Sequence, residues 1–258
     1  MHHWSGALVV SVGIPFREAI FAHPIALINH MNPGSADSFL PVYEQQFAPR
    51  LGIRANGFRR IFQHLEQLAS PDPLILETGC AREKDNWSGD GQSTILFDQY
   101  LSHKGSGNLY SVDIDPRATQ YARSATSPRT QIDTSDSVQH LHGLCLRFMA
   151  SGRVPDLLYL DSLDVNYANP VDSAVHHLKE FCAIYPCLGP KTLVAIDDCP
   201  KNLLGWRTPE NRYYLLGTIL ESGKGKFLIE FLRGIGAVSY FEEYQVGFIL
   251  GNGATRGS

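Results

Sequence analysis

Two hydrophobic patterns take turns between residues 73 and 198. Short apolar runs alternate with segments in which apolar residues recur every three or four positions. The runs are predicted strands, at residues 73–79, 108–115, 129–135, 156–161 and 192–198. The predicted helices between them lie at residues 93–101, 116–124, 138–150 and 170–188. Strands that alternate with helices in this way predict an α/β fold, with a parallel sheet covered by helices on both faces.

The last part of the chain breaks this alternation. Two β-rich runs, at residues 237–244 and 244–251, follow each other with almost nothing between them. Parallel neighbours need a crossover connection of about a dozen residues or more, so these two runs cannot be parallel neighbours. We therefore expect them to form an antiparallel pair at the edge of the sheet.

The first 70 residues are predicted to form an N-terminal extension with a helical cap. Residues 1–40 carry few charges and are interrupted by prolines, which favours an irregular segment packed on the body or on a second subunit. Residues 42–68 show helical spacing of their apolar positions. Residues 71–258 are then the sheet domain, and the extension is the candidate contact of a homo-oligomer.

Composition narrows the classes of function. Lys and Arg number 22 against 26 Asp and Glu, which disfavours a nucleic-acid-binding surface. Arg54, Arg59 and Arg60 are interpreted as a solvated helix face. The five cysteines form no CxxC pair, which disfavours a zinc finger or a disulfide framework and fits a reducing cytoplasm. The apolar run at residues 7–16 is too short to span a bilayer, so no membrane partner is expected.

Carboxylates stand at the ends of the predicted strands. They are Glu77, Asp113, Asp115, Asp161, Asp197 and Asp198. An ionised carboxylate is costly to desolvate without a partner, so it contributes nothing to the burial of a strand. In open α/β sheets, ligands bind in the crevice outside the carboxyl ends of the strands. We therefore expect these acids to line one crevice.

The loop after the first strand is rich in glycine. Gly79 allows a tight turn, Gly91 allows close approach of the backbone to a ligand, and Ser93 or Thr94 is a candidate cap of the next helix. No Lys follows Gly91, so the loop is not the phosphate cradle GxxxxGK[ST]. By itself the pattern is equally compatible with a simple turn.

Asp113 makes a nucleotide-like ligand the better interpretation of this loop. It lies at the end of the second predicted strand, about 20 residues beyond Gly91. An acid at this distance from a glycine loop accepts hydrogen bonds from ribose hydroxyls. The alternative is that Asp115 caps the next helix and Asp113 is merely exposed.

Taken together, ETG…GQST and LYSVDIDP resemble the first two motifs of class I S-adenosylmethionine (SAM)-dependent methyltransferases. DTSDSVQHL resembles the segment that flanks adenine in that superfamily. The resemblance covers residues 73–250. It implies a Rossmann-like sheet of five parallel strands plus a C-terminal antiparallel pair. It also implies SAM-binding roles for Glu77, Gly79, Gly91, Ser93, Asp113, Asp136 and Ser137.

Within that superfamily, LLYLD followed by LVAIDD is similar to metal-dependent O-methyltransferases of the catechol type, the macrocin-like type and the cephalosporin-hydroxylase-like group. This similarity implies that Asp161, Asp197 and Asp198 hold Mg²⁺, which prefers oxygen ligands. Such an ion binds substrate oxygens and lowers the pKa of a hydroxyl group. The alternative for Asp197 and Asp198 is a solvated strand end with a capping role.

One position departs from the catechol-type pattern. Those enzymes carry a catalytic Lys three residues beyond the first metal-binding Asp, and Asp164 stands there in this chain. Asp161, Asp164 and His176 are therefore the candidate catalytic residues, with His177 as a further candidate base. The GKGK segment at residues 223–226 is interpreted as a turn in the edge region of the sheet, away from the strand ends of the cofactor half.

The sequence therefore predicts a SAM-dependent methyltransferase that methylates an oxygen of a small hydroxylated molecule, assisted by Mg²⁺. The acceptor would be a sugar or secondary metabolite rather than a catechol. Two other classes stay open. One is a metal-dependent hydroxylase-like or hydrolytic enzyme on the same fold, which needs no SAM. The other is a SAM-binding protein without catalytic activity.

Overall fold

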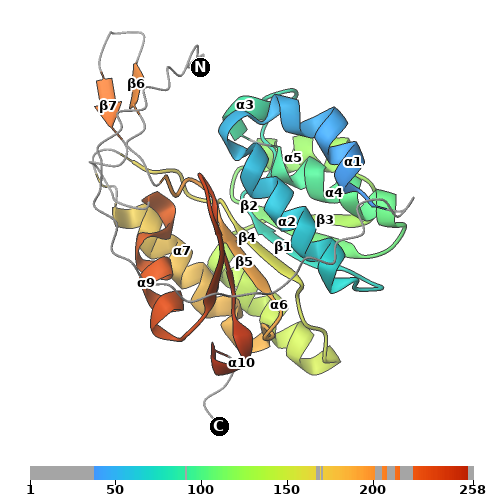
Figure 1. Cartoon of the computed structure of the whole chain (residues 1–258), viewed down its shortest axis with the longest axis vertical. Coiled ribbons are helices and arrows are strands. Elements are labelled where there is room, and N and C mark those ends of the chain that lie inside the picture. The colour runs from blue at the N-terminus through green and yellow to red at the C-terminus, as the bar shows by residue number, and fades with distance from the viewer. Residues whose placement is uncertain are drawn as a thin grey trace, which may run out of the picture.

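A seven-stranded sheet forms the centre of the protein (Figure 1). The computed structural model describes residues 38–90, 92–166, 169, 171–200, 205–207, 213–215 and 223–254. The strands of the sheet are β1 (Leu74–Thr78), β2 (Asn108–Asp113), β3 (Thr130–Thr134), β4 (Leu157–Leu160), β5 (Leu193–Ile196), β8 (Val238–Glu242) and β9 (Val246–Ile249). Their spatial order is β3-β2-β1-β4-β5-β9-β8.

The first five strands are parallel, and β9 is antiparallel to both β5 and β8. This arrangement confirms the predicted Rossmann-like sheet with a C-terminal antiparallel pair. The carboxyl ends of β1, β2, β4 and β5 consequently lie at one edge, where the predicted site residues gather. A separate antiparallel pair, β6 (Gly205–Arg207) and β7 (Tyr213–Leu215), was not predicted.

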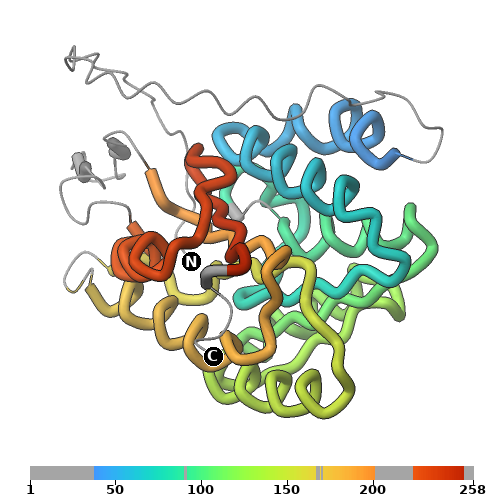
Figure 2. The backbone as a smooth tube through the Cα atoms, turned by 60° about the horizontal axis from the view of Figure 1, so that its bottom comes forward, coloured from blue at the N-terminus to red at the C-terminus, as the bar shows by residue number. Residues whose placement is uncertain are grey.

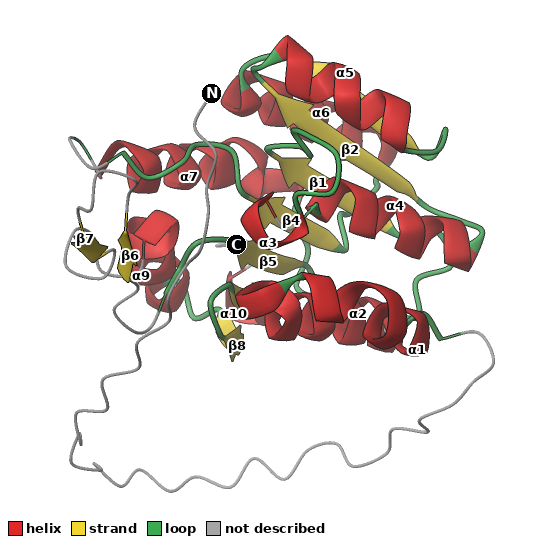
Figure 3. Ribbon diagram, turned by 90° about the horizontal axis from the view of Figure 1, so that it is seen from above, coloured by secondary structure: helices red, strands yellow, loops and turns green. Residues whose placement is uncertain are grey.

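Helices cover both faces of the sheet (Figure 3). On one face lie α1 (Leu40–Val42), α2 (Ala55–Leu68), α4 (Ser93–Lys104) and α5 (Pro116–Ala125). On the other lie α6 (Ser137–Ser151), α7 (Val171–Ile184) and α9 (Lys226–Gly234). The described residues also contain shorter elements: the π-helical turn Tyr43–Phe47, the 3₁₀ turns Ala48–Arg50, Gly52–Arg54, Tyr185–Cys187 and Gly223–Gly225, and the helices α3 (Trp87–Asp90) and α10 (Gly251–Ala254).

Two of these helices begin where side chains satisfy their first backbone amides. Asp115 precedes α5 and accepts a hydrogen bond of 2.8 Å from the Arg117 amide, and Pro116 fits the first helical position. Asp136 precedes α6 and accepts a hydrogen bond of 2.9 Å from the Gln139 amide. Both helices therefore start directly beyond the strand ends, which fixes the loops of the candidate site.

The helical stripe predicted in residues 42–68 faces the sheet. Phe58, Ile61, Phe62 and Leu65 are buried, and the ring of Phe58 stacks on Tyr159 of β4 at 5.6 Å between centroids. This region thus shares one hydrophobic core with the sheet. The domain boundary at residue 70 stays a prediction, and residues 1–37 lie outside the described part of the chain.

The turn Gly223–Gly225 leads into α9, which packs beside α7 (Figure 2). This arrangement brings a segment from the end of the chain to the carboxyl ends of the central strands. None of the helices in the described ranges combines the length and the apolar character that crossing a membrane requires.

Candidate active site

Gly79 marks the point where the loop after β1 crosses the end of β4. Its φ is +79°, a left-handed conformation that favours glycine, and its amide donates to the Val112 carbonyl at 2.8 Å. A Cβ at this position would collide with the backbone carbonyl of Asp161. The predicted tight turn is confirmed, and it packs the loop after β1 against the backbone at the end of β4. The predicted Gly91 lies outside the described residues.

Glu77 anchors the loop after β1 through a chain of hydrogen bonds. Its buried carboxylate accepts hydrogen bonds from the Thr94 hydroxyl at 2.7 Å and the Ser111 hydroxyl at 2.5 Å. Thr94 in turn accepts the Ala81 amide at 2.9 Å, so Glu77 is linked to the loop backbone. Burial raises the pKa of Glu77 to about 7, although the hydroxyls of Ser111, Ser93 and Thr94 favour the ionised form.

The predicted capping role of Ser93 or Thr94 is wrong. Gln92 occupies the position before α4 with a φ of +51°, and no side chain caps the helix there. Thr94 cannot cap because its hydroxyl is used between Glu77 and the loop amide. The Thr94 hydroxyl thus donates to the buried Glu77 carboxylate instead of capping α4.

Asp113 lies at the end of β2, half-buried beside this loop. One carboxylate oxygen accepts the Cys80 amide at 3.1 Å, and the other accepts the Asp115 amide at 2.8 Å. Asp115 is a helix cap, as the alternative interpretation held, but Asp113 is not merely exposed. Its carboxylate is held in one orientation, and each oxygen keeps a second lone pair for a ligand hydroxyl.

Ser137 and His176 belong to a network around the buried Glu180. The Ser137 hydroxyl lies 3.0 Å from His176 Nε2, and that nitrogen lies 3.2 Å from Glu180 Oε1. Glu180 also accepts the Ser162 hydroxyl at 2.6 Å. The hydrogen bond to Glu180 raises the pKa of His176. The adenine-binding role of Asp136 and Ser137, and the catalytic role of His176, stay predictions.

The neighbouring His177 points into the core, so the two histidines do not share a face. Its Nδ1 lies 2.7 Å from the Ser173 carbonyl, and its side chain is fully buried. Burial lowers the pKa of His177 to about 4, which keeps the ring neutral at physiological pH.

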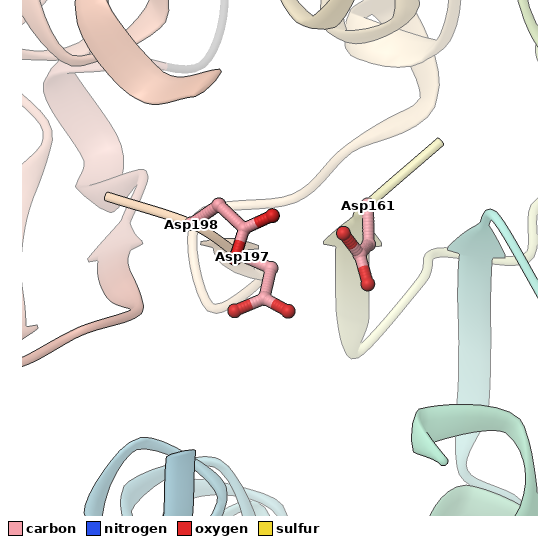
Figure 4. A group of neighbouring side chains, drawn as sticks. All are labelled: Asp161, Asp197 and Asp198. Carbon is pink, nitrogen blue, oxygen red and sulfur yellow. The ribbon is translucent and has the colours of Figure 1, made fainter. Parts of the chain in front are cut away.

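The structure brings together the three carboxylates predicted to bind metal (Figure 4). Asp161 follows β4, and Asp197 and Asp198 follow β5, which is the next strand in the sheet. One oxygen from each lies within 4.8 Å of the others. We call these three residues the acid cluster.

Lys224 reaches into the acid cluster. Its Nζ lies 2.5 Å from Asp161 Oδ1, 3.0 Å from Asp198 Oδ2 and 3.3 Å from Asp164 Oδ1. The side chain is 0% exposed. The predicted turn at residues 223–226 is confirmed as the 3₁₀ turn Gly223–Gly225, and it packs directly on the end of β5.

Arg54 is the second cation of the cluster. Its Nε donates to Asp197 Oδ2 at 2.8 Å, and its Nη2 donates to Asp198 Oδ1 at 2.9 Å. Placing Arg54 on a solvated helix face was wrong, since it is only 7% exposed. The sequence did contain one signal for the burial of Arg54. Arg54 lies four residues before Phe58, on the helical face that continues the buried stripe of α2.

Tyr244, in the connection between β8 and β9, closes the far side of the cluster. Its hydroxyl donates to Asp198 Oδ1 at 2.5 Å, and the Arg54 guanidinium lies 5.0 Å from the centre of its ring. Asp198 has a φ of +49°, which is uncommon for a residue other than glycine. The backbone of Asp198 is thus bent so that its side chain meets three partners.

Burial and the two cations act in opposite directions on these carboxylates. Burial raises the pKa of Asp161 well above its usual value, against the charge of Lys224. Burial also opposes ionisation of Asp198, but the charges of Lys224 and Arg54 hold its pKa well below the usual range.

Asp164 lies at the exposed rim of this site, where it forms a two-pronged ion pair with Arg82 at 2.8 and 3.2 Å. Partial burial opposes ionisation, but hydrogen bonds from Arg82 and the charge of Lys224 keep the pKa of Asp164 below its usual value. A carboxylate with a lowered pKa is a weak proton acceptor, which disfavours Asp164 as the catalytic base.

The acid cluster does not fit Mg²⁺ in this arrangement. The ion takes oxygen ligands at about 2.0–2.1 Å in an octahedral shell. Here Lys224 and Arg54 already donate to Asp161 Oδ1, to Asp197 Oδ2 and to both oxygens of Asp198. Two oxygens accept nothing from these cations, Asp161 Oδ2 and Asp197 Oδ1, and the second is buried without a partner among the described residues. An ion bound to them would lie beside both Lys224 and Arg54.

No family model matches the chain, and no curated protein matches it. Among solved structures, it is similar to the MycE methyltransferase from the mycinamycin biosynthetic pathway, in complex with Mg and SAH. The identity is 18%, the TM-score is 0.43, and the match covers 63% of this chain but only 37% of MycE. The O-methyltransferase from Bacillus cereus, in complex with SAH, matches at 15% identity with a TM-score of 0.43 over 85% of this chain and 93% of that one. The DhpI–SAH complex matches at 13% identity with a TM-score of 0.41, over 84% and 93%. These likenesses are too distant to assign a function, which must rest on the residues of the site.

Proposed function

We propose that the chain is a SAM-dependent methyltransferase that transfers a methyl group to an oxygen of a small hydroxylated molecule. The observation that carries the proposal is the geometry at one edge of the sheet. The Gly79 turn and the fixed carboxylate of Asp113 lie beside each other, and Gly79 directly contacts the backbone of Asp161. A cofactor site and an acceptor site would thus share a border.

The residues at the ends of β1 and β2 fit SAM. Its ribose hydroxyls are hydrogen-bond donors, and Asp113, about 20 residues beyond Gly91 of the glycine-rich loop, offers free lone pairs to them. At Gly79 the absence of a side chain lets the loop after β1 lie against the backbone of Asp161, which brings this loop next to the end of β4. SAM, when bound, supplies an electrophilic methyl group on a sulfonium.

The acceptor would lie over the ends of β4 and β5. Its oxygen lone pair forms the new O–C bond while the C–S bond breaks, and the electron pair of that bond stays on sulfur as a neutral thioether. The hydroxyl proton passes to a carboxylate at the strand ends and then to solvent. The chain contributes mainly by holding oxygen and methyl in line at near-attack distance.

Replacement of Asp113 tests the cofactor half of the proposal. Asp113→Ala removes the ribose acceptor and should weaken SAM binding by about 1–3 kcal/mol, or about 5- to 150-fold, measured by isothermal titration calorimetry. Asp115→Asn is the matched control, because it removes a nearby charge and keeps a capping side chain. Equal SAM affinity in the wild type and Asp113→Ala would remove Asp113 from the site.

The same titration separates the other classes of function. If the wild type shows no heat with SAM, the methyltransferase proposal fails. If SAM binds, incubation with labelled SAM and a panel of hydroxylated sugars and secondary metabolites follows. Label transfer to an oxygen supports the enzyme, and SAM binding with no transfer to any acceptor favours the binding protein without activity.

A further inference from the structure

We propose that Lys224 and Arg54 are the resident cations of the acid cluster, and that Lys224 excludes a divalent metal from it. The exclusion of metal follows from the cluster alone. Its consequence for catalysis, a methyl transfer that runs without a metal, rests on the function proposed above.

The first step of the argument is the hydrogen-bond count at Lys224. An ammonium group has three N–H donors and no acceptor. In the structure it has three carboxylate neighbours, Asp161, Asp198 and Asp164, at 2.5, 3.0 and 3.3 Å. Each N–H donor therefore has a carboxylate acceptor. The Lys224 ammonium links the residues after β4 to those after β5, between the carboxylates that were predicted to bind metal.

The second step is charge. When ionised, Asp161, Asp197 and Asp198 carry three negative charges. Lys224 and Arg54 carry two positive charges, so these five side chains together have one excess negative charge. A divalent ion added to it would reverse that imbalance and place its charge close to the ammonium. Two cations at about 4 Å repel each other strongly in a buried site. Metal binding therefore requires Lys224 to leave.

The third step is the anchoring of Lys224, which makes its departure costly. The Lys224 amide donates to the Asp198 carbonyl at 3.2 Å. Gly223 has a φ of +48°, and a Cβ there would overlap the same carbonyl oxygen. The turn is thus fitted against the acid it neutralises, and the lysine stem is buried in the protein rather than lying along its surface.

These contacts make Lys224 a positioning residue. Its donors are used by carboxylates, so it acts on an acceptor through the orientation of Asp161 and Asp198 and through its fixed charge. Preorganised charges of this kind stabilise developing charge without reorganisation during the reaction. In the metal-dependent alternative, a bound ion would stabilise the developing charge.

The test is a titration of the full-length protein with Mn²⁺ after dialysis against a chelator, followed by electron paramagnetic resonance of free Mn²⁺. We expect no saturable binding to the wild type up to millimolar concentrations. Lys224→Ala should bind Mn²⁺ at least tenfold more tightly, and millimolar Mg²⁺ should raise its melting temperature but not that of the wild type. Lys224→Arg should restore exclusion, and Lys226→Ala, two residues away and partly exposed, should behave as the wild type.

Stoichiometric binding of Mn²⁺ to the wild type in the micromolar range would overturn the proposal, as would a folded Lys224→Ala protein that gains no metal. If Lys224→Ala does not fold, the wild-type titration alone decides. SAM binding is measured on the same samples. A wild type that binds neither SAM nor metal refutes the proposed function and supports the exclusion of metal. A wild type that binds both SAM and metal supports the proposed function and refutes the exclusion of metal.

Discussion

Among single residues, Glu77 shows how a buried carboxyl group makes stability depend on pH. Its pKa in the folded protein is about 7, against 4.5 as the ordinary value. Between these values the folded state binds more protons than the unfolded state, so the free energy of unfolding falls as pH rises. The loss amounts to about 3 kcal/mol and is complete above pH 7.

Glu77→Gln should remove this dependence, because the amide keeps the shape and does not ionise. The variant should gain on the wild type by about 3 kcal/mol between pH 4.5 and pH 7.5. Urea unfolding at a series of pH values measures the difference, and Glu83→Gln in the same loop, at an exposed position, is the control. Parallel stability curves for wild type and Glu77→Gln would contradict the raised pKa.

Among the elements, the turn Gly223–Gly225 matters most for the site, because its close packing on the Asp198 backbone places Lys224 in the acid cluster. Gly223→Ala would combine a positive φ with an overlap at the Asp198 carbonyl, and should cost about 2–4 kcal/mol of stability. Gly236→Ala is the matched control, since Gly236 also has a positive φ but open space around its Cα. It should cost only about 1 kcal/mol. Equal losses in urea unfolding would mean that close packing of the turn on β5 contributes nothing.

The elements that could be predicted from the sequence are those with a local signal. Apolar runs of strand length and stripes of helical spacing lie in the sequence itself, and the acids that follow the strands gather wherever a parallel sheet forms. Lys224 and Arg54 have no such signal for their partners. Lys224 stands 63 positions from Asp161, and Arg54 stands 143 from Asp197. A lysine between glycines is usually exposed, so only tertiary packing reveals that this one is buried.

For the whole molecule, Arg54 connects three parts that are distant in sequence. It directly precedes α2, donates to the Gly89 carbonyl in the α3 segment at 3.1 Å, and pairs with Asp197 and Asp198 after β5. Loss of one partner from a buried ion pair leaves an uncompensated charge. Arg54→Met should therefore cost about 3–5 kcal/mol at pH 7, whereas Arg60→Met on the exposed face should change little.

The double variant Arg54→Met with Asp197→Asn shows whether the pair itself is responsible. Removing both charges should recover part of the loss, with a coupling energy of about 1–3 kcal/mol in a double-mutant cycle of urea unfolding. Strict additivity would mean that Arg54 acts through packing alone. Because the lowered pKa of Asp198 depends on Arg54 and Lys224, the stability from that acid is present at neutral pH and lost in strong acid, as pH falls through its folded pKa. Arg54→Met should raise that pKa toward the ordinary value, so the variant should lose less stability than the wild type as the pH falls below about 4.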